Sequence, residues 1–307
     1  MYREIVITLF EKDYHYGVAG LANSLVSSGF KGLYLVGYKG ELPSWTNQLK
    51  KISQNEFAIT DDVTIKFEYL DITMHFGYYK PDFLKSVFLN YSGVEKVYYF
   101  DPDIVVIAPW SFYSSWVHSG VALCLDNAFP FVYHNHPWRT EWRKLAAMDN
   151  SPYNNLNYYI NSGFIGITPR DMVLLDRWIS LTQRYKESGG DISQFEKEGH
   201  RAYKGDQDLL NAAMTVSPEV KLSIIGAEGM GFNYPVYLMA HAVEGVKPWD
   251  AKFVKQILLN GIKPSVAAKG FFNNCQYPIM VYPKSKLRQK KLSLKIYILL
   301  SISLILS

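Results

Sequence analysis

Cysteine is scarce in this sequence, which contains two such residues in 307. Cys124 and Cys275 lie far apart and show no spacing typical of a metal site. This excludes a cysteine-based metal centre as the basis of function. Cys124 falls inside the apolar run Val121–Leu125, and we expect it to be a buried thiol.

The N-terminal residues lack the basic, apolar and small-residue pattern of a secretory leader, so we expect a cytoplasmic protein. The sequence also lacks internal repeats and low-complexity tracts, which argues against repeat architectures. With 48% hydrophobic, 15% aromatic and 20% charged residues, its composition is that of a folded globular protein.

Most of the chain has no excess of positive charge. The formal net charge of +4 comes from one short segment. Six Lys and Arg residues fall between Lys284 and Lys295 with no acid among them, which leaves +4 − 6 = −2 for the rest. We therefore expect no nucleic-acid partner for the body of the protein.

Short apolar runs alternate with helical spacings over roughly the first 125 residues, which predicts an α/β fold with a Rossmann-like, mostly parallel sheet flanked by helices. We expect one catalytic domain over residues 1–265 and a tail over 266–307. The predicted strands are Ile5–Thr8, Leu33–Val36, Thr64–Tyr69, Lys96–Phe100, Val121–Leu125 and Tyr158–Ile167, and the predicted helices are Gly17–Ser28, Pro81–Asn90, Asp171–Tyr185 and Asp206–Met214.

The segment Asn127–Leu156 shows no regular pattern and is rich in Pro, His, Asn and Trp. Structureless loops of this length are uncommon inside compact domains unless they have a function. We therefore expect an irregular lid or substrate-binding insertion here.

Two acids follow the predicted strand Lys96–Phe100 directly, in the order Asp101-Pro102-Asp103. In parallel sheets, ligands bind beyond the carboxyl ends of the strands. Two carboxylates in an apolar setting are costly unless a cation neutralises them, and a hard divalent cation binds carboxylate and phosphate oxygens together. The pair alone would also fit a helix cap or a solvated loop.

A second segment, from His241 to Trp249, contains the other groups that such a site needs. The imidazole of His241 can complete a metal site begun by carboxylates. Gly245 permits close approach of a phosphate, and Lys247 supplies a positive charge for a diphosphate leaving group. Together the two segments predict a site for the departure of a nucleotide diphosphate.

The sequence resembles the family-8 glycosyltransferases, the group that contains glycogenin and the bacterial lipooligosaccharide galactosyltransferases. The similar segments occur in the family's order across roughly residues 5–250. They are the first strand with Thr8 and Tyr14 or Tyr16, Tyr-Tyr-Lys-Pro around Lys80, Tyr-Phe-Asp-Pro-Asp at Asp101 and Asp103, Asn-Ser-Gly-Phe-Ile-Gly from Asn161, Gly-Asp-Gln-Asp-Leu-Leu-Asn around Asp206, and the His241 to Trp249 segment.

The resemblance implies a GT-A fold and a Mn²⁺-dependent (or Mg²⁺-dependent) retaining transfer of a hexosyl group from a UDP-sugar to a glycan or glycolipid. The implied metal ligands are Asp101, Asp103 and His241. The implied donor-binding residues are Thr8, Tyr16, Lys80, Asp101, Asn161, Ser162, Gly163, Gly245 and Lys247, with Lys85 as an alternative to Lys80.

For catalysis the resemblance places Gln207 beside the anomeric carbon of the donor. A front-face displacement then fits best, because an amide is a poor nucleophile compared with an ionised group. Asp206 and Asp208 stay candidates for a covalent role.

The C-terminal residues combine the basic run Lys284–Lys295 with the twelve apolar and serine residues Ile296–Ser307. Twelve residues are too few to span a bilayer, which takes roughly 20. A basic run beside an apolar end predicts peripheral contact with an anionic membrane, on its cytoplasmic face. A disordered or locally packed tail is the alternative.

Two other functions remain open. A sugar-nucleotide pyrophosphorylase would need a glycine-rich, arginine-containing loop after the first strand, and Leu9–Tyr16 contains none. A non-catalytic relative could bind a nucleotide-sugar or glycan as a scaffold, which the presence of the metal and diphosphate residues disfavours.

Overall fold

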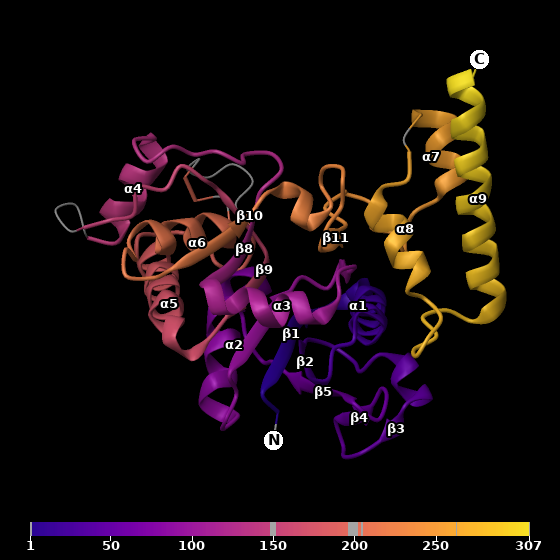
Figure 1. Ribbon diagram of the computed structural model, residues 1–307, viewed down its shortest axis with the longest axis horizontal. Coiled ribbons are helices and arrows are strands. Elements are labelled where there is room, and N and C mark those ends of the chain that lie inside the picture. Colours follow the sequence, from indigo (N-terminus) through magenta and orange to yellow (C-terminus); the bar gives the residue numbers. More distant parts are fainter. Residues whose placement is uncertain (1, 148–151, 196–201, 204, 262, 307) are drawn as a thin grey trace.

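The computed structural model describes residues 2–147, 152–195, 202–203, 205–261 and 263–306. Within them, nine strands form the larger sheet, in the order β10-β8-β9-β6-β1-β2-β5-β4-β3 (Figure 1). The strands are β1 (Glu4–Phe10), β2 (Gly32–Tyr38), β3 (Lys50–Lys51), β4 (Glu56–Ala58), β5 (Val63–Tyr69), β6 (Lys96–Phe100), β8 (Val121–Leu125), β9 (Ile160–Ile167) and β10 (Leu222–Ile225).

The sheet is mostly parallel, as predicted, but β9 lies antiparallel between β6 and β8. Strands β6, β1, β2 and β5 are mutually parallel, and so are β10 and β8. Because β9 runs the other way, its first residues lie at the edge where β6 and β8 end. Asn161, Asp101 and Asp126 thereby come to one edge of the sheet.

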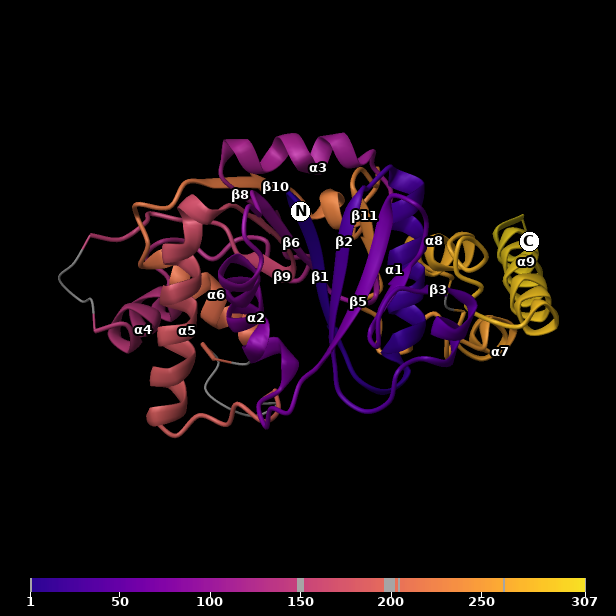
Figure 2. The same cartoon turned by 90° about the horizontal axis from the view of Figure 1, so that it is seen from below.

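Helices cover both faces of the sheet (Figure 2). On one side lie α2 (Phe76–Asn90), α4 (Pro137–Leu145), α5 (Met172–Glu187) and α6 (Asp206–Thr215). On the other lie α1 (His15–Ser28), α3 (Trp110–Trp116), α7 (Phe253–Asn260), α8 (Val266–Asn273) and α9 (Lys284–Leu306), with short 3-10 turns such as η5 (Ala227–Met230) between elements. The alternation of β1 explains the two cores, since Ile5 and Ile7 face one side while Val6 and Phe10 face the other.

A separate two-stranded sheet lies next to the end of β6. Strand β7 (Ile104–Val106) is antiparallel to β11 (Met239–His241), and Ile104 lies opposite His241. This pairing brings two segments far apart in the sequence next to the acidic turn.

Two sequence predictions need correction, and a third is confirmed. Helix α2 begins at Phe76 and not at Pro81, because the His75 side chain accepts a hydrogen bond from the Gly77 amide and caps an earlier turn. The prediction that Asn127–Leu156 is irregular is wrong for Pro137–Leu145, which is α4. The prediction of a buried Cys124 is confirmed.

The C-terminal region is helical in its described part. Leu287, Leu294 and Tyr297 of α9 belong to the same core as α1 and β1, which favours local packing over a disordered tail. The division into 1–265 and 266–307 stays a prediction. No helix in the described part of the chain combines the length and apolar character needed to cross a bilayer.

Candidate active site

The acidic turn after β6 is held from both sides. The Asp101 amide donates to Gly163 O of β9 at 2.7 Å, and the Ile104 amide donates to Asp101 O at 3.1 Å. The Tyr99 hydroxyl donates to Asp101 Oδ1 at 2.8 Å. Backbone and side chain of Asp101 are thus positioned by the sheet itself.

His241 completes a cluster with the two aspartates, as predicted. Its Nε2 lies 3.2 Å from Asp103 Oδ1 and 3.6 Å from Asp101 Oδ2. One ligand atom from each of the three residues lies within 4.8 Å of the other two. Two carboxylates and one imidazole at this separation are a donor set that fits a divalent cation, so the residues present fit the implied metal.

Two lysines neutralise the carboxylates. Lys247 Nζ donates to Asp103 Oδ2 at 2.7 Å and to Ala242 O at 2.6 Å, while Lys80 Nζ lies 3.1 Å from Asp101 Oδ1 and 2.9 Å from Asp206 Oδ2. Burial would lower the pKa of Lys80, but Asp101 and Asp206 outweigh it and raise that pKa.

Asp103 stays ionised for the same reason. Burial alone would raise its pKa, but His241 and Lys247 hold the pKa at about 2.

A second group of polar side chains lies at the same edge, from β8, β9 and α6. Asn161 Nδ2 donates to Asp126 Oδ2 at 2.9 Å, and Gln207 Nε2 donates to the same oxygen at 3.2 Å. Gln207 Oε1 accepts from the Ser162 amide at 3.2 Å. Asp126 was missed in the sequence, although it follows the predicted strand Val121–Leu125 as directly as Asp101 follows β6.

A cavity of about 360 Å³ adjoins the acidic turn at the carboxyl edge of the sheet, and of the second group only Ser162 lines it among the described residues. Seven of the fourteen expected site residues line it, while Asn161, Gly163 and Gln207 do not. The expected residues that line it are Lys80, Asp101, Asp103, Ser162, Asp206, His241 and Lys247. Tyr14, His75 and Phe195 line it as well.

Other expected residues lie outside this cavity. Tyr16 stacks on Tyr282, with ring centroids 5.1 Å apart, and Tyr14 occupies the cavity wall instead. Thr8 is fully buried and donates to Phe100 O at 2.7 Å. Asp208 accepts from the Tyr159 hydroxyl at 2.6 Å, and Gly245 lies in an exposed turn. Lys85, the alternative to Lys80, pairs with Asp176 on the surface.

Gly163 is required by the packing of the candidate metal ligands. A Cβ on this residue would lie 2.6 Å from His241 Cε1 and 2.9 Å from Asp101 Oδ2. Any larger residue would push these two side chains apart, so the glycine lets β9 pass directly behind the cluster.

No family model and no curated protein sequence matches the chain. Solved structures do match it. The bifunctional glycosyltransferase WbbM has 16% identity and a TM-score of 0.57, covering 94% of this chain and 52% of its own, so this chain spans about half of WbbM. The galactosyltransferase LgtC, solved with donor and acceptor sugar analogues, has 13% identity and a TM-score of 0.52 over 93% of this chain and 99% of its own.

An active-site variant of LgtC, with a glutamine replaced by glutamate, gives 14% identity and a TM-score of 0.53 over the same shares of the two chains. At these identities the likeness shows the fold alone. The chain has the GT-A fold of nucleotide-diphospho-sugar transferases, as the sequence predicts.

Proposed function

We propose that this protein is a metal-dependent, retaining glycosyltransferase of family 8 that moves a hexosyl group from a UDP-sugar to a glycan or glycolipid. One observation carries the proposal. Asp101, Asp103 and His241, from distant segments, converge at the carboxyl edge of a GT-A sheet beside two buried or half-buried lysines. This is the arrangement that stabilises a departing nucleotide diphosphate.

The three clustered side chains would hold Mn²⁺ or Mg²⁺, which supplies charge neutralisation for the diphosphate. Lys247 would exchange its contact with Asp103 for one with a phosphate oxygen when donor binds. Gly245 has nothing within 4 Å of an added Cβ, so its turn is open to a phosphate.

The polar group around Gln207 would hold the transferred sugar. Asn161, Ser162 and Asp206 would contact its hydroxyls, and Gln207 would lie beside the anomeric carbon. LgtC also has an active-site glutamine, the residue that is replaced by glutamate in its solved variant. Lys80 pairs with Asp206, and Tyr159 with Asp208, which supports Gln207 over a nucleophilic aspartate in this role.

The acceptor would approach through a neighbouring cavity of about 680 Å³ that shares His241 with the donor site. Phe232 and Tyr234 line it and offer apolar faces for a sugar ring. We place the protein in the cytoplasm, with residues 284–307 in peripheral contact with an anionic membrane face, where a lipid-linked acceptor is found.

Calorimetry with UDP, with and without Mn²⁺, followed by donor-hydrolysis assays, tests this function. We expect UDP binding that depends on Mn²⁺ and hydrolysis of one donor among UDP-glucose, UDP-galactose, UDP-N-acetylglucosamine and GDP-sugars. Tight UDP binding without turnover of any donor would favour the scaffold function. Absence of both would contradict the proposal.

A further inference from the structure

Charge is distributed very unevenly along this chain. Residues 251–307 contain ten Lys and Arg and no Asp or Glu, while residues 1–250 contain 22 basic and 28 acidic residues. The last part of the chain therefore carries a formal charge of +10 and the rest −6. The excess of basic residues extends well beyond the run Lys284–Lys295, because it includes Lys252, Lys255, Lys263 and Lys269.

Helices α7 and α9 lie side by side at one end of the molecule, and we refer to them as the C-terminal helix pair (Figure 1). Phe253 and Ile257 of α7 face inward with Leu294 and Tyr297 of α9, and the rings of Phe253 and Tyr297 are 6.2 Å apart. Both helices are therefore fixed to the body through a shared core.

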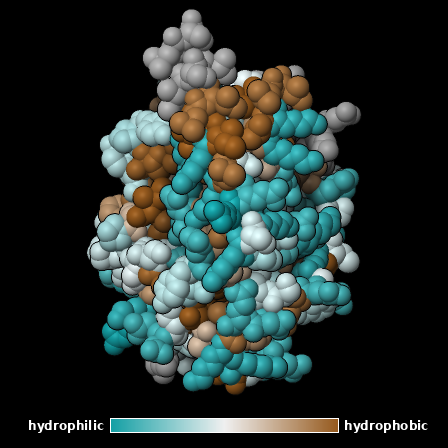
Figure 3. All heavy atoms as spheres, turned by 90° about the vertical axis from the view of Figure 1, so that its right-hand side faces the viewer, coloured by the Kyte–Doolittle hydropathy of each residue, from teal (hydrophilic) through white to brown (hydrophobic). Residues whose placement is uncertain are grey.

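Large apolar side chains are exposed on both helices of this pair. Leu258 and Leu259 of α7 are each 68% exposed, and Leu292 and Leu299 of α9 are 56% and 66% exposed. Figure 3 shows apolar side chains gathered at one end of this side of the molecule, with hydrophilic ones covering the area next to them. A patch of this kind marks a surface that contacts a partner or a membrane.

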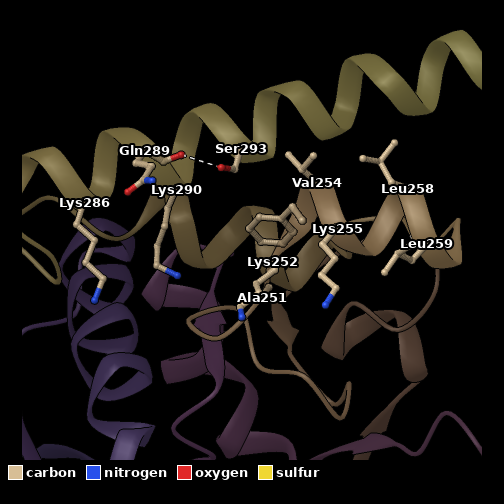
Figure 4. A pocket seen from close by; sticks show the side chains of 11 residues that line it. Ala251, Lys252, Val254, Lys255, Leu258, Leu259, Lys286, Gln289, Lys290 and Ser293 are labelled. Atoms are coloured by element: carbon tan, nitrogen blue, oxygen red, sulfur yellow. Dashed lines mark hydrogen bonds between the residues drawn. The ribbon is translucent and has the colours of Figure 1, made fainter.

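A cavity of about 610 Å³ between the two helices is lined by Leu258 and Leu259, while Leu292 and Leu299 lie outside it. Lys252 and Lys255 line it from the α7 side, Lys286 and Lys290 line it from α9, and none of the described residues that line it is an acid. Figure 4 shows Lys255, Lys286 and Lys290 extending from the two helices toward the same side. Lys290 Nζ donates to Trp249 O at 2.7 Å, so at least one of these ammonium groups is held in place.

We propose that the C-terminal helix pair docks on an anionic lipid bilayer, with the four leucines entering the interface and the lysine-lined cavity holding a lipid phosphate. A high density of lysine attracts an anionic leaflet, and exposed leucines gain free energy when they leave water. A free phosphate would leave the leucines unexplained. An anionic bilayer satisfies both features at once.

Deletion of the C-terminal residues is not a suitable test of this docking surface. Deletion of residues 284–307 removes Leu287, Leu294 and Tyr297 from the core, so loss of membrane binding could then reflect unfolding. Substitutions of exposed side chains on the pair avoid this problem.

The full-length protein can be sedimented with vesicles of phosphatidylcholine alone and of phosphatidylcholine with phosphatidylglycerol. We expect binding to the anionic vesicles only. Lys255→Glu with Lys286→Glu should weaken it at least about 25-fold, since each lysine at an anionic surface changes partitioning about five-fold. The matched control is Lys50→Glu with Lys51→Glu, which makes the same charge change on exposed β3. Equal binding by both double variants would overturn the proposal.

A second pair of variants tests the apolar contribution. Leu258→Ser with Leu259→Ser should weaken binding at least about ten-fold, while Leu89→Ser, at a 69% exposed position on α2, should leave it unchanged. If the serine variant binds as the wild type does, or if the wild type binds no vesicle and self-associates, the surface is not a bilayer-docking surface. Binding of free inorganic phosphate with no binding of vesicles would overturn it as well.

These measurements need neither donor nor metal ion. Vesicle binding by a protein that fails to hydrolyse donors would contradict only the proposed enzyme. Donor hydrolysis without vesicle binding would contradict the docking surface and the proposed membrane contact of residues 284–307, but not the proposed enzyme.

Discussion

The candidate active site and the C-terminal helix pair use charge in opposite ways. At the site, the side chains of Lys80, Asp103 and Asp206 are 6–7% exposed, and opposite charges from distant segments pair with one another. In the helix pair, lysines lie at the surface without opposite charges nearby in the sequence, because the last 57 residues contain no acid. The first arrangement fixes the geometry of a small site, and the second has the charge that the proposed docking on an anionic bilayer requires.

The physical cost of the two arrangements differs as well. A buried charge must be paired, so removing one partner leaves a charge that water cannot solvate. An exposed lysine loses only a screened, partial contribution when it is replaced. Substitutions at the site should therefore have large effects and need specific partners, while those in the helix pair should be smaller and cumulative.

The largest effect is expected for Asp103→Asn. It removes a carboxylate that faces both His241 and Lys247, and donor turnover in the presence of Mn²⁺ should fall about 10³-fold. Asp61→Asn, at an exposed position, is the control and should leave turnover unchanged. Turnover of the Asp103 variant within about ten-fold of the wild type would remove Asp103 from the metal site.

Lys80 and Lys85 provide a matched comparison on one helix. Lys80→Met leaves Asp101 and Asp206 without their shared cation, and we expect the free energy of unfolding to fall by about 3–5 kcal/mol. Lys85→Met breaks a pair with Asp176 whose side chains are 34% and 54% exposed, so the loss should be about 0–1 kcal/mol. Urea unfolding measures both, and equal losses would contradict the difference in burial.

Gln207→Ala should lower kcat for transfer about 10²-fold, with little change in the donor KM, because the side chain would act mainly in the transition state. We expect this variant to keep its fold. Circular dichroism checks this, because it would detect any loss of α6. An unchanged kcat would exclude Gln207 from catalysis and return attention to Asp206.

The smallest effect is expected at two glycines. Gly163→Ala places a methyl group against His241 and Asp101, and Mn²⁺ affinity should fall about ten-fold. Gly245→Ala meets nothing within 4 Å, so its Mn²⁺ affinity should be unchanged while its UDP affinity tests the diphosphate contact. Calorimetry measures both, and equal Mn²⁺ affinities for the two variants would contradict the role of Gly163.

Local sequence patterns were sufficient to predict elements whose buried residues follow a regular spacing along the chain. The β-branched run Ile5–Thr8 and the acidic turn after Phe100 could be interpreted without tertiary information, and the structure contains β1 and the Asp101–Asp103 turn there. Asp126 has the same signal as Asp101, an acid directly after a buried strand, and the sequence could have revealed it.

Other features depend on contacts that no local pattern encodes. Helix α4 begins at Pro137, and the His136 side chain caps it by accepting a hydrogen bond from the Trp138 amide. A histidine followed by a proline resembles a loop in the sequence. The choice between Tyr14 and Tyr16 depends on where α1 begins, because residues two positions apart face different sides of a helix.

The sequence by itself determined the α/β class, the main strands and the identities of the three clustered metal-ligand candidates. Only the tertiary structure decided that β9 runs antiparallel, that β7 pairs with β11, and that Lys252 and Lys255 share one cavity with lysines of α9. The reason is physical: hydrophobic periodicity records which side of an element is buried, whereas strand order and helix pairing depend on contacts between residues far apart in the chain.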